Sequence, residues 1–388
     1  MSETYDVVIV GGAAHGASAA YHLAADPAFS GRVLLVERDP SLARAATALS
    51  AGGIRQQFST PVNISLSLYG IDFLRRAPEL LAVDGERPDI GLVEGGYLFL
   101  ATPAGLDTLR RNHGRQAGLG ADIAFLERDA LAARFPWLAP GDLAAGCFGE
   151  TGEGWLDGYG LAQALRRKAK ALGVTLRTAE VSAIGSGNLV RLADGTAISA
   201  GAVIVTAGTG TPGLLAPLGV VLPVEPRKRY VFGFACREPL PRLPLTVDPS
   251  GVYVRSEGAG YICGASPPED AEPPADDFEV DHGFFEDAIW PVLAARIPAF
   301  AAIRPGGAWA GHYDFNTFDQ NAIVGRLPGR ENLFVATGFS GHGLQQSPGV
   351  GRGLAEIVVH GRYTSLDLTP LGYERIAAGR PLVEENVV

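Results

Sequence analysis

Two glycine-rich turns lie more than 300 residues apart in this chain, and both have the residue types of an anion-binding site. The first, residues 11–16, fits the pattern G-x-G-x-x-G at its first and third glycines, with Ala13 in place of the second. The second contains Gly338, Gly341 and Gly343. Glycines leave backbone N–H groups free to approach an anion, and the positive end of a following helix adds to the attraction.

The first turn lies in a strand–turn–helix–strand pattern that is typical of dinucleotide-binding proteins. Apolar residues 7–10 predict a buried strand, residues 17–25 a helix, and residues 33–36 a second strand that ends at Glu37. Glu37 is placed to accept hydrogen bonds from both ribose hydroxyls of an adenine dinucleotide, and its charge disfavours a 2′-phosphate. We predict that this unit binds such a cofactor; the alternative is a purely structural turn.

The second turn indicates which dinucleotide is bound. Residues 333–336 predict a buried strand before it, and the pattern after it predicts a helix with Ser347 as N-cap and Pro348 as first residue. An NAD enzyme has no need of a second glycine turn so far away, whereas a flavin ring must be held by other parts of the chain. Residues 52–53 and 207–208 provide further points of close backbone approach. The sequence favours FAD, whose reduced ring is anionic and is stabilised by a helix N-terminus.

The composition describes an acidic globular protein with room for two domains. The chain has 388 residues, of which 47% are hydrophobic. A formal net charge of −10 argues against binding nucleic acid or anionic membranes. Three widely spaced cysteines suit a reducing compartment such as the cytoplasm and match no metal-binding spacing, so no metal is expected. No apolar run reaches the roughly 18 residues of a membrane span, and residues 1–6 do not resemble a targeting signal.

The order of the predicted elements indicates an α+β fold with a discontinuous first domain. Helices are predicted at residues 103–117 and from near Asp157, and strands at 91–100, 174–176 and 202–207, with a hairpin turn at Asp194-Gly195. Residues 221–314 are rich in proline and short strands (230–235, 251–255 and 261–264), as in an antiparallel sheet, with a surface loop at 267–277. We predict a Rossmann-type FAD-binding domain (1–88, 153–220 and 318–388) with an inserted antiparallel-sheet substrate domain (89–152 and 221–317).

Several segments together resemble a known family. Residues 8–16, 37–38, 50–55, 205–208 and 337–343 are similar, in order and type, to the D-amino acid oxidase superfamily, in its sarcosine oxidase and dimethylglycine dehydrogenase branch. Residues 311–321 and 338–351 further resemble a mitochondrial subgroup implicated in the assembly of respiratory complex I. The resemblance covers essentially the whole chain, including Glu384-Glu385-Asn386.

The resemblance implies a cofactor, a reaction and a set of binding residues. The cofactor is FAD, and the reaction is hydride transfer from the carbon next to an amine nitrogen to flavin N5, which gives an imine that is then hydrolysed. The cofactor-binding residues implied by the resemblance and by the two turns are Gly11, Gly12, Ala13, Gly16, Glu37, Arg38, Ser50, Gly52, Gly53, Ile54, Val181, Ala207, Gly208, Gly338, Gly341, His342, Gly343, Leu344 and Gln345.

Three departures from the family pattern refine this expectation. Gln345 stands where sarcosine oxidases have a lysine facing the flavin, so backbone dipoles must stabilise more of the reduced ring. His312 stands where those enzymes attach FAD through cysteine, and residues 49–51 contain no histidine, so we expect noncovalent FAD, with a bond to His312 as the alternative. Ile262 occupies the position of the oxygen-activating lysine. A dehydrogenase that passes electrons to a quinone or carrier protein is therefore expected rather than an oxidase.

The expected substrate is a small amine or amino acid. Its carboxylate needs a bidentate arginine, and the candidates are Arg55 and Arg255, with Arg227, Lys228 and Arg229 as weaker ones. His342, Tyr230, Tyr253, His312 and Tyr313 are candidates to line the pocket or to deprotonate the amine, and a structural role is the alternative for each. Competing functions are an oxidase of the sarcosine- or glycine-oxidase kind using O₂, a flavoprotein assembly factor with little catalysis, and a plain NAD dehydrogenase.

Overall fold

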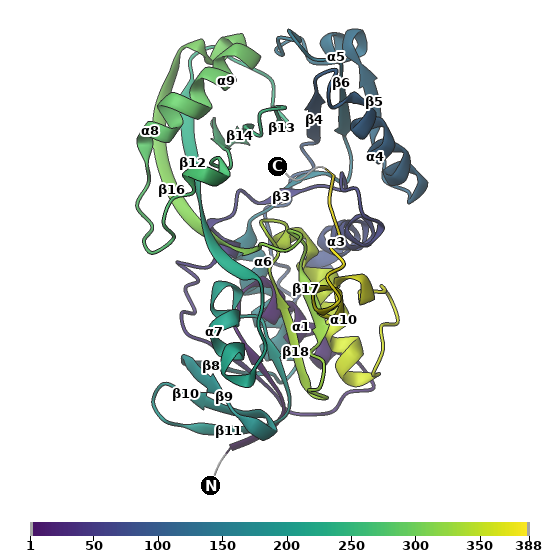
Figure 1. Ribbon diagram of the computed structural model, residues 1–388, viewed down its shortest axis with the longest axis vertical. Coiled ribbons are helices and arrows are strands. Elements are labelled where there is room, and N and C mark those ends of the chain that lie inside the picture. Colours follow the sequence, from purple (N-terminus) through teal and green to yellow (C-terminus); the bar gives the residue numbers. More distant parts are fainter. Residues whose placement is uncertain (1–2, 386–388) are drawn as a thin grey trace.

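The computed structural model describes residues 3–385, whose strands form two large sheets, one above the other in Figure 1. The lower sheet has the order β17-β18-β11-β1-β2-β8, and β9 and β10 extend it beside β11. Its strands β18, β11, β1, β2 and β8 run parallel, and β17 is antiparallel to β18. The strands are β1 (Glu3–Val10), β2 (Val33–Glu37), β8 (Thr175–Thr178), β9 (Val181–Ile184), β10 (Leu189–Leu192), β11 (Ala197–Val205), β17 (Ile323–Arg326) and β18 (Leu333–Thr337).

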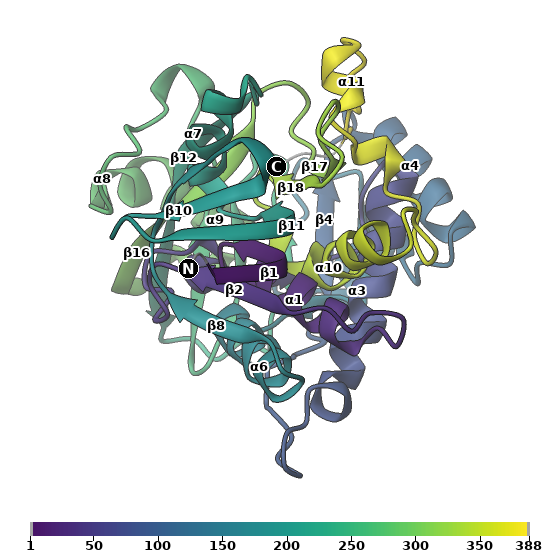
Figure 2. The ribbon, with the colours of Figure 1, turned by 90° about the horizontal axis from the view of Figure 1, so that it is seen from below.

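The alternation of side chains along β1 explains why this sheet is covered on both faces. Val7 and Ile9 pack into one core with the helices α1 (Ala14–Ala25), α6 (Gly158–Ala171) and α10 (Gly343–Val359), whereas Val8 and Val10 pack into a second core that includes α7 (Thr211–Leu215). Figure 2 shows α1, α6 and α10 on one side of the sheet and α7 on the other. An all-apolar strand is what burial on both faces requires.

The upper sheet is mixed, with one parallel pair among antiparallel ones. Its order is β16-β12-β15-β14-β13-β4-β6-β5, and β13 and β4 form the parallel pair. The strands are β4 (Tyr97–Ala101), β5 (Ala124–Glu127), β6 (Ala145–Gly149), β12 (Val224–Cys236), β13 (Leu245–Val247), β14 (Tyr253–Glu257), β15 (Gly260–Gly264) and β16 (Ile303–Asn316). All of them lie within residues 89–152 and 221–317, and we propose these ranges as the substrate domain. A small third sheet pairs β3 (Gly53–Ile54) with β7 (Gly154–Trp155).

Four of the remaining helices cover the upper sheet. Helices α8 (His282–Phe284) and α9 (Trp290–Arg296), joined by a π-helical turn at Phe285–Ile289, pack on β12 and β15, and α4 (Leu106–Gly118) and α5 (Arg128–Arg134) pack on β6. The others are α2 (Ala46–Leu49), α3 (Pro61–Leu80) and α11 (Glu374–Ala377). No helix in residues 3–385 has the length and apolar character needed to cross a bilayer.

The predicted start of the last long helix was wrong. Helix α10 begins at Gly343, so Pro348 lies inside it rather than at its first position. Proline has no N–H to donate to the carbonyl four residues earlier, and the Ser347 hydroxyl donates to that Leu344 carbonyl instead (2.8 Å). Ser347, predicted as the N-cap, therefore compensates for the proline within the helix.

Other boundaries differ from the prediction by a few residues. Helix α1 begins at Ala14, inside the predicted turn, and β4 begins at Tyr97 rather than at residue 91. Gly96 has a φ of +87°, a left-handed conformation, so the extended backbone of β4 can begin only after it. The sequence analysis did not predict α3, a helix of 20 residues.

Residues 381–385, which we call the C-terminal strap, connect both halves of the molecule. The buried Glu384 carboxylate accepts hydrogen bonds from Ser59 and Thr60, through backbone and hydroxyl groups of each, and from the Asn63 amide (2.6 Å). The strap thus caps the start of α3. The neighbouring Glu385 forms ion pairs with Arg111 and Arg115 of α4, both at 3.1 Å.

Candidate active site

A cavity of about 550 Å³ runs along the carboxyl ends of the parallel strands, from Glu37 to Tyr313. Open α/β sheets bind their ligands at this edge. The residues predicted to bind the cofactor that line the cavity are Gly11, Ala13, Glu37, Arg38, Ser50, Val181, Ala207, Gly208, Gly341, Gly343 and Leu344. Residues from both ends of the chain therefore share one elongated site.

The first glycine turn is shaped for close approach to a ligand. Gly11 has a φ of +99°, and a Cβ at Gly16 would collide with the Gly11 carbonyl oxygen. The Gly12 N–H donates to Glu37 Oε2 (2.6 Å) and the Asp39 N–H to Glu37 Oε1 (2.9 Å), which fixes the carboxylate at the end of β2. Each oxygen keeps a lone pair for a ribose hydroxyl. Gly12 and Gly16 support the turn and are not among the lining residues.

His15 gives a direct test of whether a polar cofactor fits this cavity. Its side chain is half-buried, lines the cavity and stacks on Phe339 at 3.8 Å. Its Nε2 has no hydrogen-bond partner within residues 3–385. A buried polar atom without a partner is costly, and a bound ligand with polar groups satisfies it. The sequence analysis did not select His15, although its place inside the glycine motif was a signal.

The second glycine turn is held by the half-buried carboxylate of Asp314. Asp314 accepts hydrogen bonds from the Gly338 N–H (2.7 Å) and the Thr337 hydroxyl (3.3 Å), and burial raises the pKa of Asp314 to about 6. Gly338 and Gly341 have φ values of +72° and +93°. A Cβ at Gly341 would lie 2.7 Å from the Tyr313 ring, so glycine brings the turn and that ring together.

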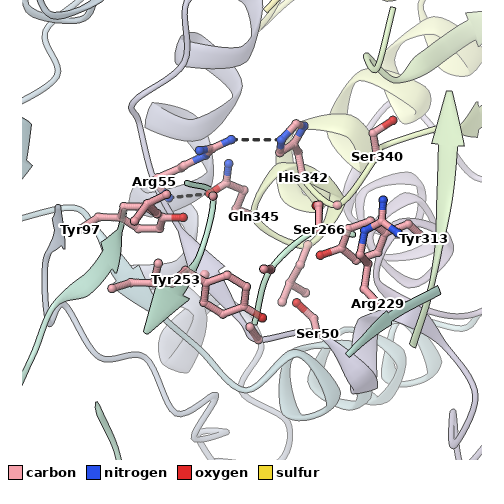
Figure 3. Close-up of a pocket in the computed structure, with 18 of the residues that line it drawn as sticks. Ser50, Arg55, Tyr97, Arg229, Tyr253, Ser266, Tyr313, Ser340, His342 and Gln345 are labelled. Carbon is pink, nitrogen blue, oxygen red and sulfur yellow. Dashed lines mark hydrogen bonds between the residues drawn. The ribbon is translucent and has the colours of Figure 1, made fainter. Parts of the chain in front are cut away.

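A smaller cavity of about 120 Å³ adjoins the larger one. Ser50, Tyr313, Gly341 and Leu344 line both cavities. Figure 3 shows Arg55, Tyr97 and Tyr253 on one side of the smaller cavity and Arg229 and Tyr313 on the other. Gly53, His342 and Gln345 also line it, whereas Gly52, Ile54 and Gly338 line neither cavity. The predicted residues near the flavin ring thus divide between two adjoining sites.

Arg55 is a buried cation that faces the smaller cavity. It is 6% exposed, and its guanidinium lies over the rings of Phe58 (4.6 Å) and Phe99 (5.1 Å). One of its nitrogens lies 3.1 Å from His342 Nε2, and its backbone N–H donates to Gln345 Oε1 (2.6 Å; Figure 3). No carboxylate in residues 3–385 pairs with Arg55 within 4.0 Å. Its charge is available to a ligand.

His342 orients this arginine and carries no charge itself. Burial and the positive charge of Arg55 lower the pKa of His342 to about 3, so the ring is neutral at pH 7. A guanidinium can only donate hydrogen bonds. His342 Nε2 therefore accepts from Arg55, and the ring hydrogen is on Nδ1.

The other cation of the smaller cavity is already neutralised. The two terminal nitrogens of Arg229 donate to the Glu272 carboxylate at 2.8 and 2.7 Å. The Arg229 guanidinium also lies 5.6 Å from the centre of the Tyr313 ring. Arg227 pairs with Glu225 and Glu272, which leaves Arg55 as the cation best placed to receive an anion.

Arg255, the second predicted carboxylate ligand, has a different environment. Its Nε and one terminal nitrogen donate to the Ala51 carbonyl at 3.1 and 2.8 Å, it pairs with Glu257, and it lies 4.8 Å over the Trp155 ring. Arg255 is not among the lining residues of either cavity. The structure thus brings it to the loop before Gly52 rather than into the site.

His312 lines the larger cavity rather than the smaller one. Its ring stacks on Phe278 at 4.3 Å, and its Nε2 donates to the Asp277 carbonyl at 2.7 Å. Lys228, a weaker candidate, pairs with the Asp277 carboxylate at 2.6 Å. These contacts hold the segment that contains Phe278 against the cavity, where it forms one wall.

Glu153, which the sequence pattern did not indicate, binds the two residues that follow Arg55. Its side chain is fully buried and accepts hydrogen bonds from the Gln56 N–H and from the Gln57 side chain (2.7 Å). Burial raises the pKa of Glu153 to about 7. A lone acid between Gly152 and Gly154 was the only signal in the sequence.

Comparisons with known proteins agree on one family. The DAO family model, described as FAD dependent oxidoreductase, matches residues 6–357. FAD-dependent oxidoreductase domain-containing protein 1 of Xenopus laevis is 42% identical over 425 residues, covering 100% of this chain and 85% of that protein. Glycine oxidase of Geobacillus kaustophilus is 30% identical over 388 residues, covering 97% and 98%. The crystal structure of glycine oxidase from that organism has a TM-score of 0.81 at 27% identity, covering 96% and 98%.

A further solved structure bears on the fold alone. The crystal structure of L-proline dehydrogenase from P. horikoshii has a TM-score of 0.85 at 24% identity, covering 98% of this chain and 100% of that one. Together these matches show the α+β FAD-binding fold and FAD as the cofactor.

Proposed function

Because the chain belongs to the DAO family of FAD-dependent oxidoreductases, we propose that it oxidises the C–N bond of a small amine or amino acid. When bound, FAD supplies the two-electron acceptor for the hydride lost from the carbon next to nitrogen. The observation that supports an acidic substrate is Arg55, a buried guanidinium without a carboxylate partner in residues 3–385. It faces a cavity of about 120 Å³ that adjoins the cofactor cavity.

Five polar residues of the smaller cavity have roles in this proposal. Arg55 binds the substrate carboxylate with two nitrogens, and neutral His342 holds the guanidinium in position. Burial raises the pKa of Tyr97, Tyr253 and Tyr313, so these phenols stay protonated at neutral pH and donate hydrogen bonds rather than accept the amine proton. The substrate therefore enters with a neutral amine, whose lone pair favours hydride loss.

We propose that FAD is bound without a covalent link. His312 Nε2 is engaged with the Asp277 carbonyl and its ring is stacked on Phe278, which favours a packing role. Backbone N–H groups of the second glycine turn, the start of α10 and the Gln345 side chain take the place of a charged residue at the ring. Three free thiols are consistent with the cytoplasm as the site of action.

A dehydrogenase is favoured over an oxidase. Ile262, 4% exposed in β15, stands where the family resemblance implies an oxygen-activating lysine. Without that charge, reduction of O₂ loses its electrostatic assistance, and a quinone or a carrier protein is the expected acceptor. The similarity to glycine oxidase is the observation that favours an oxidase as the second candidate. A role in assembly with little catalysis rests on the sequence resemblance to the mitochondrial subgroup.

The proposal is tested by anaerobic reduction of the flavin with a panel of N-methyl amino acids, D- and L-amino acids, proline and opines, followed at 450 nm. At least one acid is expected to bleach the flavin, and Arg55→Ala is expected to abolish bleaching while FAD stays bound. Arg110→Ala, which alters an exposed ion pair of α4, is the control. A flavin that no compound in the panel reduces contradicts the proposal, and peroxide release in air at the full turnover rate identifies an oxidase instead.

A further inference from the structure

Arg55 and Glu153 are two buried, opposite charges that belong to one cluster without forming an ion pair. Glu153 is fully buried and Arg55 is 6% exposed. Glu153 is tied to the residues that follow Arg55, through the Gln56 N–H and the Gln57 side-chain nitrogen, and that nitrogen also donates to the Tyr97 carbonyl (3.1 Å). The carboxylate thus lies behind the same loop that presents the guanidinium to the cavity.

The cluster contains few other charges that affect Glu153. Tyr97 of β4 and Cys147 of β6 face it, and burial raises the pKa of both groups, that of Cys147 to about 12, so both remain neutral. Beyond Gly152, the Glu94 carboxylate accepts the Gly152 N–H and is itself paired with Arg75. Arg55 is the cation whose field reaches Glu153, and it acts against the desolvation that holds the pKa of Glu153 near 7.

A carboxylate that binds Arg55 changes this balance. The ligand's negative charge offsets the positive charge of Arg55, which otherwise stabilises ionised Glu153. It also adds a second negative charge to a region from which water is excluded. The buried cluster then holds one cation and two anions. Protonation of Glu153 restores one cation and one anion.

We propose that Glu153 is a positioning residue that takes up one proton from solvent when a substrate carboxylate binds Arg55, so that the site binds an anion and a proton together. The proposal rests on the proposed function, since it takes the ligand of Arg55 to be a carboxylate. Nothing is oxidised or reduced in this step. The O–H bond of Glu153 forms with a lone pair of its carboxylate, while the bond to the same proton in hydronium or the buffer acid breaks and that donor keeps the electron pair.

The sign of the pH dependence follows from this linkage. Below about pH 7 Glu153 is already protonated, so Arg55 meets the ligand without a competing carboxylate and affinity does not change with pH. Above that pH, binding requires proton uptake, and affinity falls by up to tenfold per pH unit. A site without this coupling shows no slope in the same range, because benzoate itself stays ionised.

The experiment uses the FAD-loaded enzyme and benzoate, a carboxylate without an oxidisable C–N bond. Affinity is measured from the flavin absorbance change between pH 6 and 9, and the number of protons taken up is measured by calorimetry in phosphate and in Tris, whose heats of ionisation differ. We expect close to one proton at pH 8 and close to none at pH 6. Glu153→Gln is expected to abolish uptake and to remove the slope, while Glu150→Gln, an exposed acid of the same loop, keeps both.

The outcomes separate the two proposals. Benzoate binding that is lost in Arg55→Ala but brings no proton to the wild-type enzyme at pH 8 overturns the inference and leaves the proposed function standing. A slope that persists in Glu153→Gln overturns the inference as well. Binding that survives Arg55→Ala overturns both. The wild-type proton count decides the matter even if Glu153→Gln does not fold.

Discussion

Replacing Glu384 by alanine tests whether the C-terminal strap stabilises the whole molecule. The change removes the acceptor for backbone and hydroxyl donors of Ser59 and Thr60 and for the Asn63 amide, all of which are buried. A buried donor left without its partner costs about 1 to 3 kcal/mol, so with several donors affected together we expect a loss on the order of 3 to 5 kcal/mol. With an unfolding entropy of about 2.1 cal/mol/K for each of 388 residues, the midpoint of thermal unfolding falls by about 4 to 6 °C.

The adjacent residue provides a matched control. Glu385→Gln breaks ion pairs with Arg111 and Arg115, whose side chains are 54% and 44% exposed, so it costs at most about 1 kcal/mol, or about 1 °C. Both variants are compared with the wild type as FAD-loaded protein by differential scanning calorimetry. If the thermal unfolding midpoint of Glu384→Ala is no lower than that of Glu385→Gln, the strap does not stabilise the molecule and the reasoning is refuted.

Three further predictions follow from the site and its supports. Gly16→Ala places a Cβ against the Gly11 carbonyl, so gel-filtered protein is expected to carry almost no flavin absorbance, while Gly114→Ala, at an open helical position, keeps it. Burial raises the folded pKa of Glu153 to about 7, so its contribution to stability is fully present below pH 4.5 and is lost as the pH rises from there through 7. Between pH 5 and pH 8 this loss is about 2 to 3 kcal/mol, and Glu153→Gln is expected to remove it when unfolding is compared at the two pH values. Ser347→Ala is expected to lower the free energy of unfolding by about 1 kcal/mol in the wild type. The same change is expected to cost much less in a Pro348→Ala background, because alanine restores the N–H donor that proline lacks. Equal costs in the two backgrounds, measured by denaturant unfolding, would contradict the proposed compensation.

The parts of the fold that could be predicted are those fixed by local pattern. Residues 7–10, 33–36 and 333–336 are apolar runs bounded by glycine or polar residues, and each lies within a buried parallel strand. Helix α3 was missed because its apolar stripe is interrupted by serines and because its start depends on Glu384, more than 300 residues away. A boundary that a distant side chain determines leaves little trace in nearby sequence.

The same distinction applies to the site. The glycine turns and Glu37 line one cavity, because the strand–turn–helix pattern that locates them is local. The difference between Arg55 and Arg255 could not be predicted, since both are arginines beside glycine-containing loops. They differ because Arg255 donates hydrogen bonds to the Ala51 carbonyl, which lies 204 residues earlier in the sequence. Glu153 was missed for the same reason, since its partners belong to another segment.

The position of β11 and β18 in the parallel sheet has a consequence for synthesis of the protein. Strand β1 pairs with β11, and β11 pairs with β18, so the centre of the sheet contains residues 3–10, 197–205 and 333–337. At about 5 to 20 residues per second, β18 leaves the ribosome roughly 15 to 60 seconds after β1. Strand β1 pairs with β2 and β11, so it is the other edge of β11 that has no partner until β18 is made. Because the cavity is lined by residues on both sides of β18 in the sequence, we expect the complete FAD site to form only after the second glycine turn has been made.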